Sequence, residues 1–321
     1  MSYFIFGGSG FIGSHLVSYI KEQDPAAIIY NLDIVESCHD NRSVFIQCDV
    51  RNQIKTDTPV SSDDIIFNLA AVHRTPGHPD HEYFETNIRG AENICAFAEK
   101  HGIQKIIFTS SIAPYGASEE LKEETTLPTP NTPYGISKLV AEKIHETWQA
   151  RDGSRKLLIV RPGVVFGKGE NGNFTRLYWG IRKRRFFYAG RTDTIKACIY
   201  VKELVRFMLN TTVNQQAGVE LFNCGFYPAY SIQQIVETIK KTTGLKRNVI
   251  KINAFLLTIV ASAISVLGGK KIGIHPERVK KLMISTNISS KKLASSGYRF
   301  KYSLEDALAD WHNDNNNQYL N

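Results

Sequence analysis

Short apolar runs rich in β-branched residues alternate with longer amphipathic segments through the first half of the chain, and this alternation most constrains its fold. The runs predicted to be strands are 3–6, 28–33, 43–47, 65–70, 105–110 and 157–161, and the segments predicted to be helices include 81–101 and 134–150. Parallel strands need a crossover connection, usually a helix. The alternation therefore predicts an α/β fold with a Rossmann-type, doubly wound parallel sheet. Such sheets bind ligands at the carboxyl ends of their strands.

A glycine-rich turn follows the first predicted strand directly. Gly7, Gly10 and Gly13 stand at GxxGxxG spacing and open an apolar helix. Glycines let the backbone approach a pyrophosphate, and the helix N-terminus offers it unpaired N–H groups and the positive end of a dipole. Taken alone, the pattern also fits a glycine-rich turn that binds no ligand.

Asp33 favours a dinucleotide as the ligand of this turn. It ends the second predicted strand about 20 residues after the turn, where a carboxylate can hydrogen-bond the adenosine ribose hydroxyls. The carboxylate also repels a 2′-phosphate, and no basic residue follows it closely, so NAD is favoured over NADP. The cofactor residues predicted from these two segments are Gly7, Gly10, Phe11, Ile12, Gly13 and Asp33.

Tyr134 and Lys138 form the predicted catalytic pair. They stand four residues apart at the start of a predicted helix, so both side chains leave the same face. A tyrosine with a pKa near 10 is a poor base, and lowering that pKa to roughly 7 takes about 4 kcal/mol of phenolate stabilisation. A neighbouring ammonium and the positively charged nicotinamide would supply it. Ser111, after the preceding strand, would orient the reacting oxygen. Alternatively, Tyr134 and Lys138 only decorate a surface helix.

The regular alternation stops after about residue 163, where glycine, asparagine and basic residues become frequent. A chain of 321 residues is also longer than one core usually serves. We expect an NAD-binding Rossmann domain over 1–165, with a returning segment near 195–222. A smaller, mostly α-helical substrate-binding part, interleaved with the first, would cover 166–321 and include helices over 231–243 and 303–312.

The net charge of +8 raises the question of a nucleic-acid partner, and residues 182–185 are the densest basic run. Lysine pairs are otherwise spread along the chain, which is typical of solvated helix faces, so we expect no nucleic acid. The apolar stretch 254–267 holds 14 residues, whereas a membrane span needs about 20. We expect a buried or interfacial helix there and no membrane-surface contact, with contact between this stretch and a lipid surface as the alternative.

The five cysteines are scattered, with no CxxC pair and no histidine at metal-ligand spacing. This pattern predicts a reducing compartment and no metal site. The N-terminus shows neither the basic region nor the cleavage site of a signal peptide. We therefore expect a cytoplasmic protein.

Over nearly its whole length the sequence resembles the extended short-chain dehydrogenase/reductases, the NAD-dependent epimerase/dehydratase family. The matching pieces are GGSGFIG (7–13), Asp33, Cys48-Asp49-Val50, NLAAVH (68–73), TNIRG (86–90), SSIAPYG (110–116), PYGISK (133–138), Arg161-Pro162 and Tyr200-Val201. Within that family, residues 161–177, the apolar helix near 254–268 and residues 278–311 most resemble nucleotide-sugar 4-epimerases and 4-keto-sugar reductases of polysaccharide biosynthesis.

The resemblance implies further site residues and an oligomeric state. Those that would contact the cofactor are Asp49 and Val50 at the adenine, Leu69, Ala70, Ala71 and His73 along the dinucleotide, and Pro162 at the nicotinamide. Those that would bind substrate are Ser111, Asn173, Phe174 and Lys196, the last at the diphosphate. Alternatively, Asn173 caps a helix and Lys196 faces solvent. Helices 81–101 and 134–150 would pair in a homodimer.

The activity that the resemblance implies is 4-epimerisation of a UDP-hexose or UDP-N-acetylhexosamine by transient oxidation at C4. A nucleotide-diphospho-4-keto-sugar reductase, an extended-type alcohol or steroid dehydrogenase and a non-enzymatic NAD-sensing protein are the alternatives. Residues 109–112 lack the acidic pair of the family's dehydratases, so dehydration is not expected. Val164 stands where several UDP-galactose 4-epimerases have asparagine, which argues against that substrate. Lys196 replaces a common arginine and loses bidentate recognition of phosphate.

Overall fold

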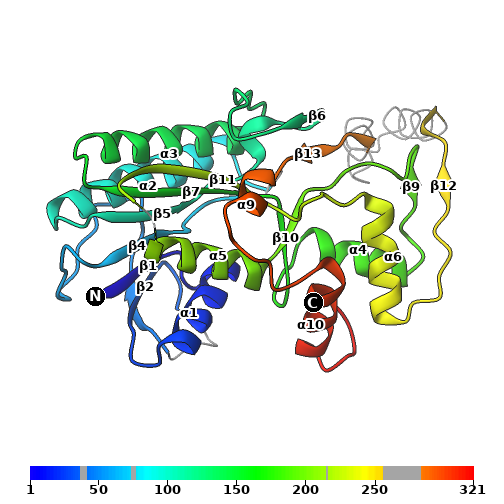
Figure 1. Ribbon diagram of the computed structural model, residues 1–321, viewed down its shortest axis with the longest axis horizontal. Coiled ribbons are helices and arrows are strands. Elements are labelled where there is room, and N and C mark those ends of the chain that lie inside the picture. The colour runs from blue at the N-terminus through cyan, green and yellow to red at the C-terminus, as the bar shows by residue number, and fades with distance from the viewer. Residues whose placement is uncertain (37–41, 74–76, 215, 256–282) are drawn as a thin grey trace. The chain divides into compact units, whose positions relative to one another are not determined.

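The computed structural model describes residues 1–36, 42–73, 77–214, 216–255 and 283–321 (Figure 1). The chain divides into two compact units, each built from three separate stretches. Unit 1 comprises Met1–Gly116, Glu124–Pro162 and Val201–Cys224, and unit 2 comprises Ala117–Glu123, Gly163–Tyr200 and Gly225–Asn321.

A seven-stranded, fully parallel sheet runs through unit 1, in the order β11-β7-β5-β4-β1-β2-β3. Its strands are β1 (Ser2–Phe6), β2 (Ile28–Asp33), β3 (Val44–Gln47), β4 (Ile65–Asn68), β5 (Lys105–Thr109), β7 (Lys156–Pro162) and β11 (Gly218–Cys224). The strand order reverses between β1 and β4, which is where doubly wound sheets bind ligands. The predicted α/β fold with a Rossmann-type sheet is confirmed.

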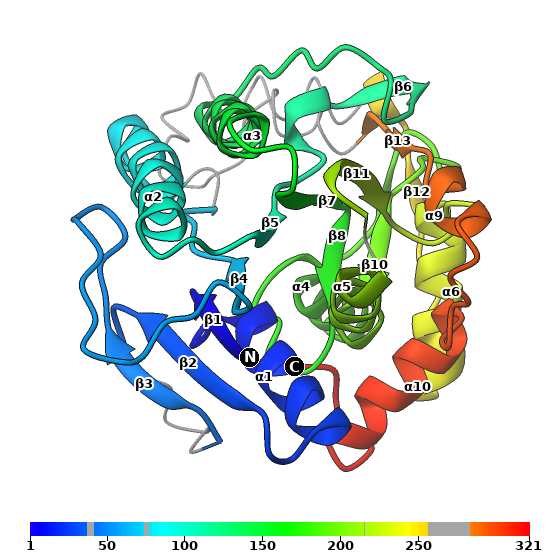
Figure 2. The ribbon, with the colours of Figure 1, turned by 60° about the vertical axis from the view of Figure 1, so that its left-hand side comes forward.

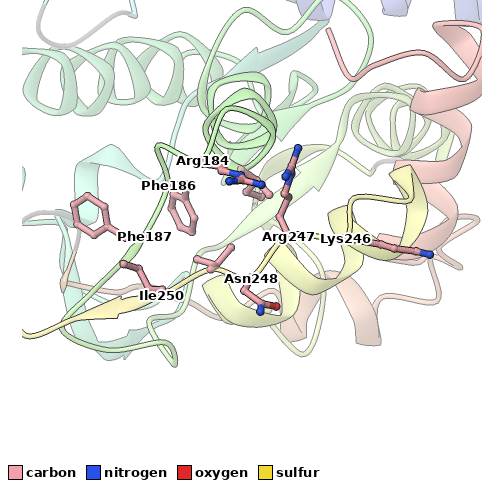
Figure 3. Close-up of a pocket in the computed structure, with 9 residues that line it drawn as sticks. Arg184, Phe186, Phe187, Lys246, Arg247, Asn248 and Ile250 are labelled. Carbon is pink, nitrogen blue, oxygen red and sulfur yellow. The ribbon is translucent and has the colours of Figure 1, made fainter.

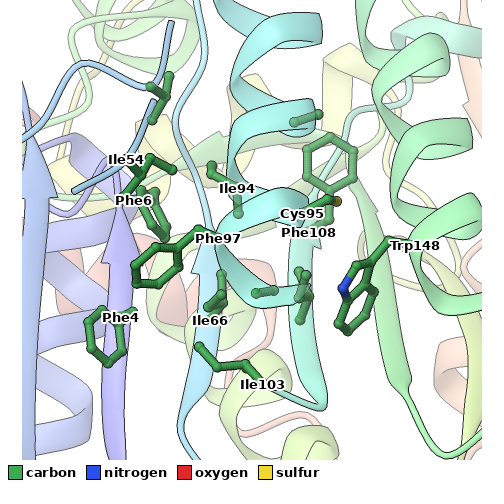
Figure 4. Packing of buried hydrophobic residues seen from close by; sticks show 14 of the residues in the cluster. Phe4, Phe6, Ile54, Ile66, Ile94, Cys95, Phe97, Ile103, Phe108 and Trp148 are labelled. Carbon is green, nitrogen blue, oxygen red and sulfur yellow. The ribbon is translucent and has the colours of Figure 1, made fainter. Parts of the chain in front are cut away.

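Helices cover both faces of this sheet (Figure 2). On one face α2 (Asp80–Lys100) packs against α3 (Pro133–Ala150), and on the other α1 (Phe11–Gln23) packs against α5 (Val201–Asn214). Under α2, the Phe97 ring lies 5.7 Å from the Phe4 ring and 6.0 Å from the Phe6 ring, with Ile66 buried beside them (Figure 4). Burying each such side chain stabilises the fold by roughly 1.5–3 kcal/mol. The core thus fixes the sheet edge that carries the site.

The described residues of unit 2 form three short parallel strand pairs and the other described helices. The pairs are β8 (Val164–Phe166) with β10 (Cys198–Tyr200), β9 (Tyr188–Ala189) with β12 (Lys251–Ile252), and β6 (Ser118–Lys122) with β13 (Thr286–Ile288). The helices are α4 (Asn173–Arg182), α6 (Ile232–Thr243), α9 (Lys291–Ser295) and α10 (Leu304–Asp314), and a 3-10 turn, η1 (Ala113–Tyr115), belongs to unit 1. Ser231 and Ser303 form capping boxes that fix where α6 and α10 begin.

The strands and helices predicted with bounds over 3–161, 231–243 and 303–312 are confirmed, with ends within two residues. Of the apolar stretch 254–267, only Ala254 and Phe255 fall within the described residues, so the helix expected there lies outside them, as do residues 278–282. Across the described ranges, no helix has the length and apolar character needed to cross a membrane.

Candidate active site

The glycine-rich turn joins β1 to α1 at the carboxyl edge of the sheet. It leaves no room for a side chain at Gly7 or at Gly13. Gly7 adopts a φ of 82°, and a Cβ there would stand 2.8 Å from the backbone nitrogen of Ala70. At Gly13 a Cβ would lie 2.4 Å from the Gly7 carbonyl oxygen and 2.5 Å from Gly8 Cα. Gly10 is the N-cap of α1, with no side-chain cap and no acidic residue in the first turn. The N–H groups of α1 are therefore available to a phosphate.

Asp33, the last residue of β2, turns its carboxylate toward this glycine turn. The carboxylate accepts hydrogen bonds from the backbone N–H of Ser9, at 3.0 Å, and of Ile34, at 2.7 Å. These bonds hold it at the strand end, partly exposed, where it can accept further bonds from a ribose. A turn with glycine at positions 7, 10 and 13, an uncapped helix end and an oriented carboxylate together fit a dinucleotide such as NAD.

The residues expected at the adenine lie beyond the end of β3. The pKa of the Cys48 thiol is raised to about 11, mainly by burial and further by the charges of Asp49 and Asp33. Both carboxylates are therefore near enough to influence this thiol. Asp49 is engaged by Arg51 through Nε at 2.9 Å and Nη2 at 2.6 Å. Val50 is buried. The neighbouring Asp49 carboxylate is therefore already paired, while the Asp33 carboxylate keeps capacity for a ligand.

The segment 69–73, expected to line the cofactor, is tied to α2 by a side chain that the sequence interpretation missed. Asn87 accepts a hydrogen bond from the Val72 N–H at 2.9 Å and donates to the Val72 carbonyl at 3.1 Å. Its amide also donates to the Ser137 hydroxyl of α3 at 2.9 Å. At the start of the segment, the Leu69 N–H donates to the Phe6 carbonyl. The loop is therefore held between β1 and both helices.

The helix that carries Tyr134 and Lys138 begins at a defined cap. Thr132 is the N-cap of α3, and its hydroxyl accepts a hydrogen bond from the Gly135 N–H at 3.1 Å. Lys138 is buried, and its Nζ donates to the Thr109 carbonyl at the end of β5 at 2.7 Å. The ammonium is therefore held at the end of β5.

Tyr134 and Ser111 meet at this strand end. The Ser111 hydroxyl accepts a hydrogen bond from the Ala113 N–H at 3.1 Å. Although part of the Tyr134 side chain is accessible, desolvation raises its pKa to about 12, and a hydrogen bond with the Ser111 side chain lowers it only in part. Desolvation lowers the pKa of Lys138 to about 7, opposed by the Glu142 carboxylate. The lowering of the Tyr134 pKa that we expected from a neighbouring ammonium is absent in the protein alone.

A buried ion pair beneath these residues was not predicted from the sequence. Glu142, four residues after Lys138, accepts hydrogen bonds from Arg161 Nε at 2.8 Å and Nη2 at 2.5 Å, and from the Ser110 hydroxyl at 2.5 Å. Arg161, near the end of β7, also lies 4.6 Å from the Tyr115 ring centroid. The spacing of four residues from Lys138 is the signal that could have placed Glu142 on the same helix face. Pro162, expected at the nicotinamide, follows Arg161 and is buried.

The other residues expected to bind substrate belong to unit 2. Asn173 is exposed and opens α4, but the N-cap is Gly172, so Asn173 does not cap the helix. The Phe174 ring is buried and stacks on Phe166 at 4.3 Å, so it is part of the core of unit 2. Lys196 does not simply face solvent, because its Nζ donates to a backbone carbonyl at 2.8 Å and desolvation lowers its pKa.

Comparison with known proteins decides the family. The model of the NAD dependent epimerase/dehydratase family matches residues 3–225. The chain belongs to this family. The resemblance inferred from the motifs is thereby confirmed, and this member of the epimerase/dehydratase family is an NAD-dependent enzyme.

Curated relatives cover much or nearly all of this family member. It is 31% identical over 309 residues to N-acetyl-alpha-D-glucosaminyl-diphospho-ditrans,octacis-undecaprenol 4-epimerase from Escherichia coli O157:H7, which covers 95% of this chain and 92% of that protein. It is 26% identical over 274 residues to UDP-glucose 4-epimerase from Halalkalibacterium halodurans, covering 76% of this chain and 81% of that protein. The fold matches the crystal structure of UDP-glucuronic acid 4-epimerase from Bacillus cereus in complex with NAD, with a TM-score of 0.72, 20% identity and coverage of 98% and 99%.

Replacing Gly13 with alanine should weaken NAD binding about tenfold or more, which corresponds to at least about 1.4 kcal/mol. The added Cβ meets backbone atoms of the turn at 2.4 and 2.5 Å, so the phosphate-binding turn itself must move. Isothermal titration calorimetry with NAD measures the change. The matched control is Gly153→Ala, whose Cβ would meet no atom within 4 Å. Equal affinities in the two variants would contradict this role of the turn.

Lys138 should make stability depend on pH above neutrality. Its pKa falls from 10.5 to about 7 on folding, so between these values the unfolded chain binds more protons than the folded one. The cost of burying Lys138 is therefore largest below pH 7 and decreases as the pH rises towards 10. We expect the urea midpoint of Lys138→Met to gain less between pH 7 and pH 9 than that of the wild type. Lys143→Met, exposed on the same helix, should keep the wild-type gain.

Proposed function

We propose that this enzyme is a nucleotide-sugar 4-epimerase that acts on a UDP-hexose or UDP-N-acetylhexosamine by transient oxidation at C4, in polysaccharide biosynthesis. The observation that carries the proposal is the meeting of the Tyr134 and Ser111 hydroxyls at the end of β5, with Lys138 bound to the Thr109 carbonyl beside them. This set lies in the same unit as the glycine turn and Asp33. A phenol and a second hydroxyl in such a place can take a proton from a sugar hydroxyl and return it.

The mechanism assigns one task to each of these residues. Tyr134 removes the proton of the C4 hydroxyl, Ser111 holds the same oxygen by a hydrogen bond, and Lys138 supplies positive charge near the strand end. NAD, when bound, supplies the hydride acceptor and a positively charged ring that favours the phenolate. Because the pKa of Tyr134 is about 12 in the protein alone, the phenol stays protonated until the cofactor is present. Return of the proton and hydride leaves no net oxidation, which distinguishes epimerisation from reduction.

We assign NAD binding and the catalytic set to unit 1, and substrate recognition to unit 2. Asn173, exposed at the start of α4, would meet the substrate, and the stacked Phe174 would hold that helix end in place. Lys196 would meet the diphosphate. We place the enzyme in the cytoplasm, which is supported by the free, buried state of the four cysteines that the described residues include.

A second candidate substrate is a sugar carried on a polyprenyl diphosphate. It is favoured by the relative from Escherichia coli, whose name gives an undecaprenol-linked substrate and whose match is longer and more identical than that of the UDP-glucose 4-epimerase reported above. Both carriers present a diphosphate to the enzyme, so the same catalytic residues serve either one. Incubation of the purified enzyme, without added reduced cofactor, with UDP-N-acetylglucosamine and with N-acetylglucosaminyl-diphospho-undecaprenol decides between them. Turnover only after addition of NADH or NADPH would instead indicate a 4-keto-sugar reductase.

Tyr134→Phe should lower the turnover number by about 10²–10⁴-fold, since it removes the group that exchanges the proton. C4 epimers separated by chromatography give the measurement. Tyr227→Phe, at a half-exposed tyrosine of unit 2, is the matched control and should keep full activity. Unchanged turnover in Tyr134→Phe would remove the proposed chemistry.

We also propose a homodimer formed through α2 and α3. Ile136 and Val140 lie one turn apart on α3 and remain 39% and 37% exposed in the single chain. The pair forms an exposed apolar patch on α3. Such a patch is suited to a helical interface with a second copy of the chain.

Val140→Glu should shift the protein from dimer to monomer, because it places a carboxylate in the centre of the proposed interface. Static light scattering of the purified enzyme reports the mass. The same substitution at Val219, which is 43% exposed on β11, should leave the mass unchanged. A monomeric wild type, or a dimer that tolerates Val140→Glu, would contradict the interface.

A further inference from the structure

The densest basic run of the sequence, residues 182–185, takes no part in the proposed chemistry, yet it borders a cavity in unit 2. The cavity measures about 500 Å³ and lies between this run and a second basic segment that is distant in sequence (Figure 3). The first segment contributes Arg184, Phe186 and Phe187, and the second contributes Lys246, Arg247 and Ile250. Cationic and apolar side chains thus share one surface.

The backbone explains why the two segments meet. After α4, Arg184 takes a φ of 56°, and the Gly180 carbonyl accepts hydrogen bonds from the N–H groups of Arg185 and Phe186. This turn leads into β9, which pairs with β12 in parallel. The N–H of Tyr188 donates to the Ile250 carbonyl at 2.9 Å. Because both basic segments directly precede their strands, the parallel register places them at the same end of the strand pair.

The charge of this surface is one-sided. Residues 181–190 and 244–252 hold seven arginine and lysine residues and no aspartate or glutamate, in a chain whose net charge is +8. Arg182 and Lys183 use the Tyr178 hydroxyl and the Trp179 ring. Within the described ranges, no carboxylate lies at ion-pair distance from the four remaining cations outside β12, which are Arg184, Arg185, Lys246 and Arg247.

Exposed apolar side chains accompany these cations. Phe186 and Phe187 are only half-buried, and Ile250 is 64% exposed. Unpaired cations next to exposed hydrocarbon match the boundary of a lipid bilayer, where anionic headgroups lie above acyl chains. A nucleic acid also offers phosphates, and its bases could stack on the phenylalanine rings, but it has no apolar layer to cover the exposed aliphatic side chain of Ile250. A bilayer complements the cations, the rings and Ile250 together, so it is the better complement.

We propose that the basic surface formed by 182–187 and 246–250 binds the anionic headgroups of a lipid bilayer, with Phe187 and Ile250 entering the interfacial layer. Clusters of about four to eight basic residues are typical of such binding. This proposal departs from the expectation of no membrane-surface contact. Binding does not depend on the proposed catalysis, but it would bring the enzyme to the surface where a polyprenol-linked substrate resides.

The test is co-sedimentation of the full-length enzyme with two kinds of vesicle, pure phosphatidylcholine and an equimolar mixture with phosphatidylglycerol. We expect binding to the mixed vesicles only, weakened by added salt. Arg184→Glu combined with Arg247→Glu should reduce the apparent affinity about tenfold or more, since each reversal replaces attraction by repulsion. The control, Lys55→Glu combined with Lys100→Glu, makes the same charge change at exposed positions of unit 1 and should bind like the wild type.

A second variant tests the apolar part of the surface. Ile250→Ser combined with Phe187→Ser leaves the charge unchanged and should weaken vesicle binding. Unchanged binding would indicate a purely electrostatic contact and would overturn the interfacial insertion. All variants should keep the wild-type thermal midpoint and turnover on a soluble UDP-sugar, which excludes misfolding.

Three results would overturn the proposal. These are a wild type that stays in the supernatant with mixed vesicles, a charge-reversal variant that sediments like its control, and a single-stranded RNA oligonucleotide that displaces the vesicles through the same arginines. Vesicle binding without any epimerisation would instead reject the proposed catalytic function and leave the membrane surface standing.

Discussion

The buried ion pair between Glu142 and Arg161 holds the catalytic helix against the sheet. Desolvating two charges is costly, and such a pair is stable only where its geometry is good and further hydrogen bonds satisfy it. Here Arg161 donates twice to the carboxylate, and the Ser110 hydroxyl donates a third bond. Loss of one partner would leave an unpaired buried charge, which typically costs about 3–5 kcal/mol. Because Lys138 and Tyr134 precede Glu142 on α3, the pair fixes both over the end of β5.

The same carboxylate balances the electrostatics of the site. Burial alone would drive Lys138 towards its neutral form, and the Glu142 charge opposes this, which leaves the Lys138 pKa at about 7. For Tyr134, the hydrogen bond with Ser111 offsets burial only in part, and its pKa rises to about 12. The free enzyme therefore holds a neutral phenol beside a lysine close to its titration point. In the proposed mechanism, the positive charge of bound NAD would favour the phenolate, so proton removal would depend on the cofactor.

Local patterns carried most of what the sequence predicted correctly. Strand and helix periodicity located the sheet and its helices. The spacing of Gly13 and Asp33 predicted a tight turn between β1 and α1 with a carboxylate beside it. The contacts of Asn87 and the ion pair of Glu142 with Arg161 were not predicted, because each depends on partners that only the tertiary fold brings near. The hydrogen bond from Lys138 to the Thr109 carbonyl was not predicted for the same reason, since spacing along the sequence does not show which strand end a lysine reaches.

Charge distribution shows the same limit more strongly. Along the sequence the basic residues look dispersed, and dispersion is typical of solvated helix faces. The parallel pairing of β9 with β12 removes that dispersion by placing 182–187 beside 246–250. Because the two segments contain no acidic residue, pairing them concentrates positive potential that neither segment would produce alone. Placing like charges together raises the free energy of the folded protein. Binding to an anionic surface neutralises these charges and lowers the free energy again.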